Sequence, residues 1–81
     1  MKIAVIGTGY VGLVSGACFA EFGWDVACID KSTERITSLE KGIMPIYEPG
    51  LEALVVKNTS AGRLSFSLEY SPFVENADIV F

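Results

Sequence analysis

The 81-residue chain contains no histidine and only two cysteines, Cys18 and Cys28, which lie ten positions apart. A structural zinc site needs four Cys or His ligands and a disulfide framework needs several cysteine pairs, so we predict no metal site and no disulfide. Both cysteines fall in apolar segments, whereas a catalytic thiolate needs exposure and a positive environment. We therefore expect two buried, reduced cysteines in a cytoplasmic protein, and no catalytic residue among them.

The chain is also poor in positive charge and in long apolar runs. Six Lys and Arg residues stand against ten Asp and Glu, for a net charge of −4, which argues against nucleic acid or an anionic membrane as partner. Residues 3–20 carry no charge and could pass for a signal peptide, but glycines interrupt them and the continuous apolar run covers only residues 3–6. Export or membrane insertion is therefore the less favoured alternative.

Short apolar stretches alternate with longer helical patterns, which is typical of βαβ units on a parallel sheet. The first helical pattern is apolar nearly all round, so we expect that helix to be buried. The predicted strands are residues 2–6, 25–29, 63–67 and 78–81. The predicted helices are residues 10–22, a helix capped by Ser32 and ended by Gly42, one that starts at Pro49 as its first residue, and a short one opened by Ser71 and Pro72.

The clearest motif is a G-x-G-x-x-G that directly follows the first predicted strand and opens the first helix. Gly7 allows a tight turn out of the strand, Gly9 lets a pyrophosphate approach the backbone, and Gly12 lets the helix lie close to the sheet. The amides of Tyr10 and Val11 then stand at the positive end of the helix, where a pyrophosphate is stabilised. This arrangement predicts a dinucleotide-binding turn.

An acidic residue stands where this motif requires one. Asp30 follows the second predicted strand, 23 residues after Gly7, and can accept hydrogen bonds from the adenosine ribose. Because a carboxylate repels a 2′-phosphate, Asp30 favours NAD over NADP. Lys31 and Arg35 lie nearby as further candidate cofactor residues; an arginine here can accommodate a 2′-phosphate, or both can be an ordinary solvated helix start. The less favoured alternative for the whole motif is a tight turn with Asp30 solvating a strand end.

Taken together, these features predict an α/β Rossmann-type parallel sheet with crossover helices and the strand order 3-2-1-4. A complete dinucleotide-binding fold has six strands and needs roughly twice this length. We therefore expect residues 1–81 to be the N-terminal part of an NAD-binding Rossmann domain, an incomplete fold holding its first four strands.

Three segments resemble the UDP-glucose/GDP-mannose dehydrogenase family. They are residues 2–17, which include the glycine motif, the P-I-Y-E-P-G-L-E segment at 45–52, and G-R-L-S-F at 62–66. Between them the resemblance covers essentially the whole chain. Tyr47 resembles the residue of the UDP-glucose branch more than that of the GDP-mannose branch. Trp24 departs from the family pattern, in which a histidine is expected after the glycine at position 23.

The resemblance implies an NAD-dependent enzyme that oxidises the C6 alcohol of a nucleotide sugar, UDP-glucose, to a carboxylate in two steps and works as a homodimer. It carries over Val11, Asp30 and Arg35, with the glycines, as NAD contacts. The family's cysteine nucleophile and its partners would lie beyond Phe81, so the chain alone is expected to be inactive. A dehydrogenase for GDP-mannose or a related nucleotide sugar, and a non-catalytic dinucleotide-binding module, remain as alternatives.

Overall fold

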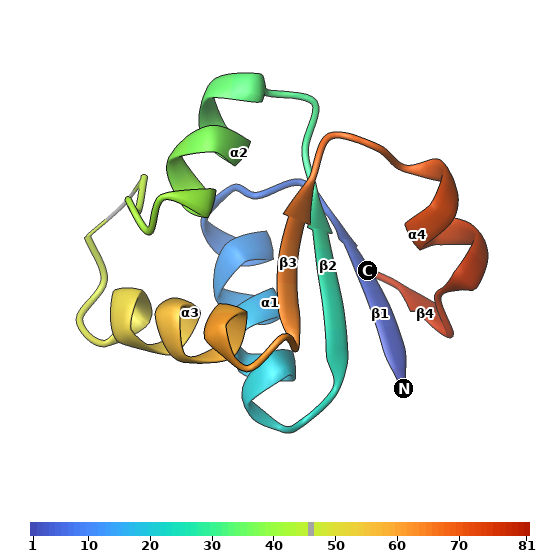
Figure 1. Ribbon diagram of the computed structural model, residues 1–81, viewed down its shortest axis with the longest axis horizontal. Coiled ribbons are helices and arrows are strands. Elements are labelled where there is room, and N and C mark those ends of the chain that lie inside the picture. The colour runs from blue at the N-terminus through green and yellow to red at the C-terminus, as the bar shows by residue number, and fades with distance from the viewer. Residues whose placement is uncertain (46) are drawn as a thin grey trace.

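The computed structural model describes residues 1–45 and 47–81, and its centre is one parallel sheet (Figure 1). Every neighbouring pair of strands runs parallel, in the order β3-β2-β1-β4, so the predicted fold class and strand order are confirmed. The strands are β1 (Lys2–Ile6), β2 (Asp25–Ile29), β3 (Leu64–Ser67) and β4 (Ile79–Val80).

The helices cover the two faces of the sheet unequally. In Figure 1, α1, α2 and α3 lie on one side of the sheet and α4 lies on the other, beside β1 and β4. The helices are α1 (Tyr10–Glu21), α2 (Thr33–Glu40), α3 (Leu51–Ser60) and α4 (Ser71–Asn76). In the part of the chain that the structure describes, no helix is long and apolar enough to cross a membrane.

The core lies between the sheet and the helices α1, α2 and α3. Val5, Leu13 and Val55 are almost completely buried there, and each such side chain stabilises the fold by roughly 1.5–3 kcal/mol. Helix α1 packs closely on β2, since a Cβ added at Gly16 would stand 2.6 Å from the sulfur of Cys28. Burial raises the pKa of the Cys28 thiol to about 12, which fits the predicted inert, buried cysteine.

Two expectations about α1 are wrong. The helix is not buried all round: Tyr10 and Val11 are 53% and 68% exposed, and Cys18 is exposed rather than buried. The reason is that the sheet and α3 cover only one stripe of the helix, while an apolar sequence does not itself say which face is covered. The buried residues of α1 are Leu13, Gly16, Ala17 and Ala20, at the three- and four-residue spacing of one helix face.

The start of α3 also differs from the prediction. The helix begins at Leu51, and its N-cap is Gly50 with a φ of +84°, so Pro49 lies before the helix and not at its first position. A left-handed residue here is easily adopted only by glycine. The ends of α1 and α2 are as predicted, because Gly23 and Gly42 follow them with φ of +101° and +81°.

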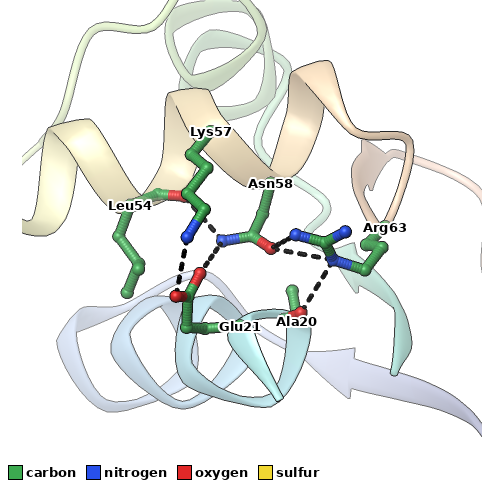
Figure 2. Close-up of polar contacts among 6 residues, drawn as sticks. All are labelled: Ala20, Glu21, Leu54, Lys57, Asn58 and Arg63. Carbon is green, nitrogen blue, oxygen red and sulfur yellow. Dashed lines mark hydrogen bonds and ion pairs between the residues drawn. The ribbon is translucent and has the colours of Figure 1, made fainter. Parts of the chain in front are cut away.

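A polar cluster centred on the buried Asn58 joins α1, α3 and the start of β3 (Figure 2). We call Glu21, Lys57, Asn58 and Arg63 the Asn58 cluster. Asn58 is completely buried; its Nδ2 donates to Glu21 Oε1 at 3.1 Å, and its Oδ1 accepts from Arg63 Nε at 3.1 Å. Arg63 Nε also donates to the carbonyl oxygen of Ala20 at 3.0 Å, and Lys57 Nζ pairs with Glu21 at 2.9 Å. The cluster therefore fixes the C-terminal end of α1 against α3.

Candidate functional site: the glycine turn and the end of β2

The glycine turn joins the carboxyl ends of β1 and β2. Gly7 follows β1 with a φ of +94°, a conformation that L side chains rarely adopt, and its amide donates to the carbonyl oxygen of Ile29 at 2.6 Å. The expected role of Gly7 as the residue that turns the chain is therefore confirmed. The next residue, Thr8, is completely buried.

The other two glycines shape the space around the turn. A Cβ added at Gly9 would meet nothing within 4 Å, so the backbone at the N-cap of α1 is open to a bound group. A Cβ added at Gly12 would overlap the carbonyl oxygen of Gly7, so only glycine lets α1 lie this close to the turn. The open backbone at Gly9 fits a pyrophosphate, which needs close approach to the chain.

The first turn of α1 contains no acidic residue, and its N-cap makes no side-chain hydrogen bond. The amides of Tyr10 and Val11 stand in this turn, at the positive end of the helix, where an anion is stabilised. Both side chains are exposed. The Tyr10 hydroxyl donates a long hydrogen bond of 3.4 Å to Glu48, which links the turn to the segment before α3.

Asp30 lies beside this turn, immediately after β2, and is only 8% exposed. Its Oδ2 accepts from the Thr8 amide at 2.9 Å, the Thr8 hydroxyl at 2.7 Å and Arg35 Nη1 at 3.2 Å, while Oδ1 accepts from the Ser32 amide at 2.9 Å. Burial alone would raise the pKa of this carboxyl, but the bonds from Ser32, Thr8 and Arg35 outweigh it and hold the pKa well below its usual range. The group is therefore a carboxylate at neutral pH.

The two predicted basic residues differ in position. Arg35 in α2 forms an ion pair with Asp30, and its side chain is 44% exposed. Its amide also donates to the Ser32 hydroxyl at 3.2 Å, which confirms Ser32 as the N-cap of α2. Lys31 is exposed at the start of the connection between β2 and α2. The structure thus brings Asp30 and Arg35 together, and it leaves the side chain of Lys31 exposed to solvent.

Sequence reasoning missed one residue of this site, Thr8. It occupies the first variable position of the motif, which carries no expectation of residue type, and only its burial beside Asp30 reveals its contacts. The second segment of the family resemblance gives less information. Its Ile46 lies outside the described residues, and Tyr47 is 92% exposed.

Comparisons with known proteins agree with this geometry. The model of the UDP-glucose/GDP-mannose dehydrogenase family, NAD binding domain, matches residues 1–81. UDP-glucose 6-dehydrogenases of Rhizobium meliloti and Bacillus subtilis (YwqF) are 54% and 53% identical over 81 residues, all of this chain and 18% of each relative. The chain thus spans about a fifth of the length of the curated relatives it matches.

Solved structures give the same result. A GDP-mannose dehydrogenase from Pseudomonas aeruginosa superposes with a TM-score of 0.94 at 38% identity, over 100% of this chain and 19% of that one. A UDP-glucose dehydrogenase from Pyrobaculum islandicum superposes with a TM-score of 0.91 at 38% identity, over 99% of this chain and 18% of that one. The contacts of individual residues with NAD stay predictions. The chain belongs to the UDP-glucose/GDP-mannose dehydrogenase family, whose NAD-binding domain it matches from its first residue to its last.

Proposed function

We propose that the protein carrying this chain oxidises the C6 alcohol of UDP-glucose to a carboxylate with NAD, and that this chain binds the adenosine and pyrophosphate half of the cofactor. The observation that carries the proposal is the open glycine turn at the start of α1, with the ionised Asp30 beside it. NAD, when bound, accepts the hydride from the sugar. Converting an alcohol into a carboxylate removes four electrons, so each sugar requires two NAD.

The residues of this chain bind and orient the cofactor. The backbone at Gly9 admits the pyrophosphate, and the amides of Tyr10 and Val11 stabilise its charge. Asp30 accepts hydrogen bonds from the ribose hydroxyls and disfavours a 2′-phosphate. Holding the adenosine half in place positions the nicotinamide for hydride transfer, which requires near-attack geometry.

UDP-glucose is the favoured substrate because the relatives at 54% and 53% identity are named UDP-glucose 6-dehydrogenases. A second candidate is GDP-mannose, supported by the solved GDP-mannose dehydrogenase with a TM-score of 0.94 but only 38% identity. The similarity of fold does not separate the two, because the solved UDP-glucose dehydrogenase superposes almost equally well.

The test is an assay of the full-length protein with NAD and either UDP-glucose or GDP-mannose, in which NADH absorbance is followed. We expect turnover with UDP-glucose and two NADH formed for each sugar consumed. Turnover with GDP-mannose alone would select the second candidate. NAD binding without turnover of either sugar would contradict both candidates and leave a dehydrogenase for a related nucleotide sugar or a non-catalytic dinucleotide-binding module.

Three further proposals accompany the activity. Residues 1–81 alone have no dehydrogenase activity, because the glycine turn and Asp30 hold only the adenosine and pyrophosphate half of NAD, whereas hydride transfer requires the nicotinamide held against the sugar; NADH formation by the purified, folded chain would contradict this. The full-length protein is a homodimer, which light scattering tests. It is cytoplasmic, which fractionation of the source cells tests.

A further inference from the structure

Thr8 binds Asp30 twice from a completely buried position. The Thr8 amide donates to Asp30 Oδ2 at 2.9 Å, and the Thr8 hydroxyl donates to the same oxygen at 2.7 Å. The hydroxyl contact is the shortest of the four hydrogen bonds on this carboxylate. A hydroxyl group has one proton to donate, and this one is directed at the candidate ribose acceptor.

The four hydrogen bonds on Asp30 differ in how easily a ligand can replace them. A carboxylate offers about four acceptor positions, two on each oxygen. Three donors, the Thr8 amide and hydroxyl and Arg35, share Oδ2, whereas the Ser32 amide alone occupies Oδ1. Oδ1 therefore keeps an acceptor position for a ligand. Arg35 is 44% exposed and makes the longest contact, 3.2 Å, so it is the donor that a ligand can replace without opening the core.

We propose that Thr8 is a positioning residue for cofactor discrimination: its hydroxyl holds the Asp30 carboxylate in the orientation that accepts the ribose hydroxyls of NAD and repels the 2′-phosphate of NADP. This inference rests on the proposed binding of NAD by this chain. In this proposal Thr8 contributes, through Asp30, to the discrimination between NAD and NADP.

The physical reason is that the Thr8 hydroxyl opposes the pull of Arg35. Both groups donate to Asp30 Oδ2, one from the buried turn and one from the exposed side of α2. Without the hydroxyl, the carboxylate can rotate toward Arg35, which then neutralises more of its charge. NAD would lose a well-placed acceptor, whereas NADP would meet less repulsion, so the preference between the two cofactors would narrow.

The test compares binding of NAD and NADP to the full-length protein and its Thr8→Val variant by titration calorimetry, with no sugar present. The substitution keeps nearly the same shape and volume and replaces the hydroxyl with a methyl group, which cannot donate a hydrogen bond. We expect the Kd for NAD to rise about tenfold, because the ribose hydroxyls lose one well-placed hydrogen bond to the charged Asp30, and the Kd for NADP to change less than about twofold. Thr8→Ser, which keeps the hydroxyl, should retain the original ratio of the two constants.

Thr59→Val is the matched control. It removes a threonine hydroxyl that donates to the carbonyl oxygen of Val55 within α3, away from the glycine turn, and it should leave both constants unchanged. If Thr8→Val loses affinity for NAD and NADP by the same factor, Thr8 has a purely structural role and the inference is overturned. A smaller difference between the two Kd values in Thr8→Ser would overturn it as well. Thr8→Ala, a second variant without the hydroxyl, gives the same comparison if Thr8→Val does not fold. If the unmodified protein binds NAD but the ratio stays constant in both hydroxyl-free variants, only this inference fails; if it binds no NAD, the proposed function fails with it.

Discussion

Two polar clusters, each centred on a buried side chain, stand at opposite ends of α1: the Asn58 cluster, and an Asp30 cluster made of Asp30 and its partners Thr8, Ser32 and Arg35. At its N-terminal end, Asp30 accepts hydrogen bonds from Thr8, Ser32 and Arg35; at its C-terminal end, Asn58 bonds to Glu21 and Arg63. In both, each buried side-chain nitrogen or oxygen has a partner, as it does throughout the described residues. Hydrogen-bond satisfaction alone therefore does not distinguish a binding site from a structural contact.

The two clusters differ in the space beside them. Next to Asp30 the backbone at Gly9 is open and one donor, Arg35, is 44% exposed, so a ligand can enter and replace it. Asn58 is completely buried, and its partner Arg63 is committed to the carbonyl oxygen of Ala20 at the end of α1. The Asn58 cluster can only fix the packing, whereas the Asp30 cluster can exchange partners. The comparison predicts that substitutions in the Asn58 cluster mainly lower the free energy of unfolding, whereas substitutions in the Asp30 cluster mainly change the affinity for the cofactor.

The largest effect on cofactor affinity is expected from Gly12→Ala, which disturbs the glycine turn at the N-terminal end of α1. Its Cβ would overlap the carbonyl oxygen of Gly7, which belongs to the backbone and cannot move without displacing the turn. We expect a stability loss of about 1–3 kcal/mol and a rise of at least roughly 100-fold in the Kd for NAD, because close packing of α1 on the turn is lost. Denaturant unfolding and NAD titration measure the two quantities.

Gly16→Ala is the control for that substitution. Its Cβ would stand 2.6 Å from the Cys28 sulfur, inside the core and one helical turn away from Gly12. A comparable loss of stability with unchanged NAD affinity is expected, and Cys28→Ala should relieve the clash. Normal NAD binding by Gly12→Ala would contradict the assigned role of that glycine.

Asn58→Leu tests the other cluster. The change leaves the Arg63 guanidinium and the Glu21 carboxylate without their central partner, so we expect the free energy of unfolding to fall by about 2–4 kcal/mol. The Kd for NAD should change less than about twofold. Lys57→Met removes only an exposed ion pair and should cost less than about 1 kcal/mol. A parallel fall in NAD affinity in Asn58→Leu would show that the two ends of α1 are coupled.

Asp30→Ala should weaken NAD binding in the full-length protein by about 1.5–3 kcal/mol and narrow its preference over NADP, because a charged acceptor is lost. The stability contributed by this carboxylate has a defined pH range. Since its pKa is lowered on folding, that stability is complete above the unfolded pKa of roughly 4 and is lost as the pH falls toward the folded value. The wild-type and Asp30→Ala proteins should therefore converge in stability in acid. If the wild-type and Asp30→Ala proteins have similar Kd values for NAD and for NADP, Asp30 does not contact the cofactor and only joins β2 to the turn.

The smallest effect concerns the cysteines. Cys18 is exposed and should react with iodoacetamide in the folded protein, whereas burial raises the pKa of Cys28 to about 12 and should protect it until the core opens. Mass spectrometry of the labelled protein measures the two rates. Faster labelling of Cys28 in Asn58→Leu would show that the Asn58 cluster holds α1 on the sheet, and equal rates for both cysteines would contradict the packing of β2.

The sequence predicted the sheet and the turn because both depend on local chemistry. Apolar runs separated by helical patterns indicate parallel strands, and Gly7 stands where the chain needs a positive φ. The burial of Asn58, the exposure of Cys18 and the contacts of Thr8 could not be predicted in this way. Each depends on which distant element lies beside the residue, and a position in a motif or a helix end does not specify that neighbour.

The position of β1 has a consequence for how the sheet assembles. This strand is synthesised before the other three, yet it lies between β2 and β4 and pairs with Ile79 and Val80 only after residues 7–78 have been made. No two neighbouring strands are joined by a hairpin, so every pairing must await a helical crossover and close a long loop. During translation, the edge of β1 that faces β4 therefore waits longest among the strand edges that pair within this sheet, and chaperone binding or premature aggregation can act on it throughout that interval.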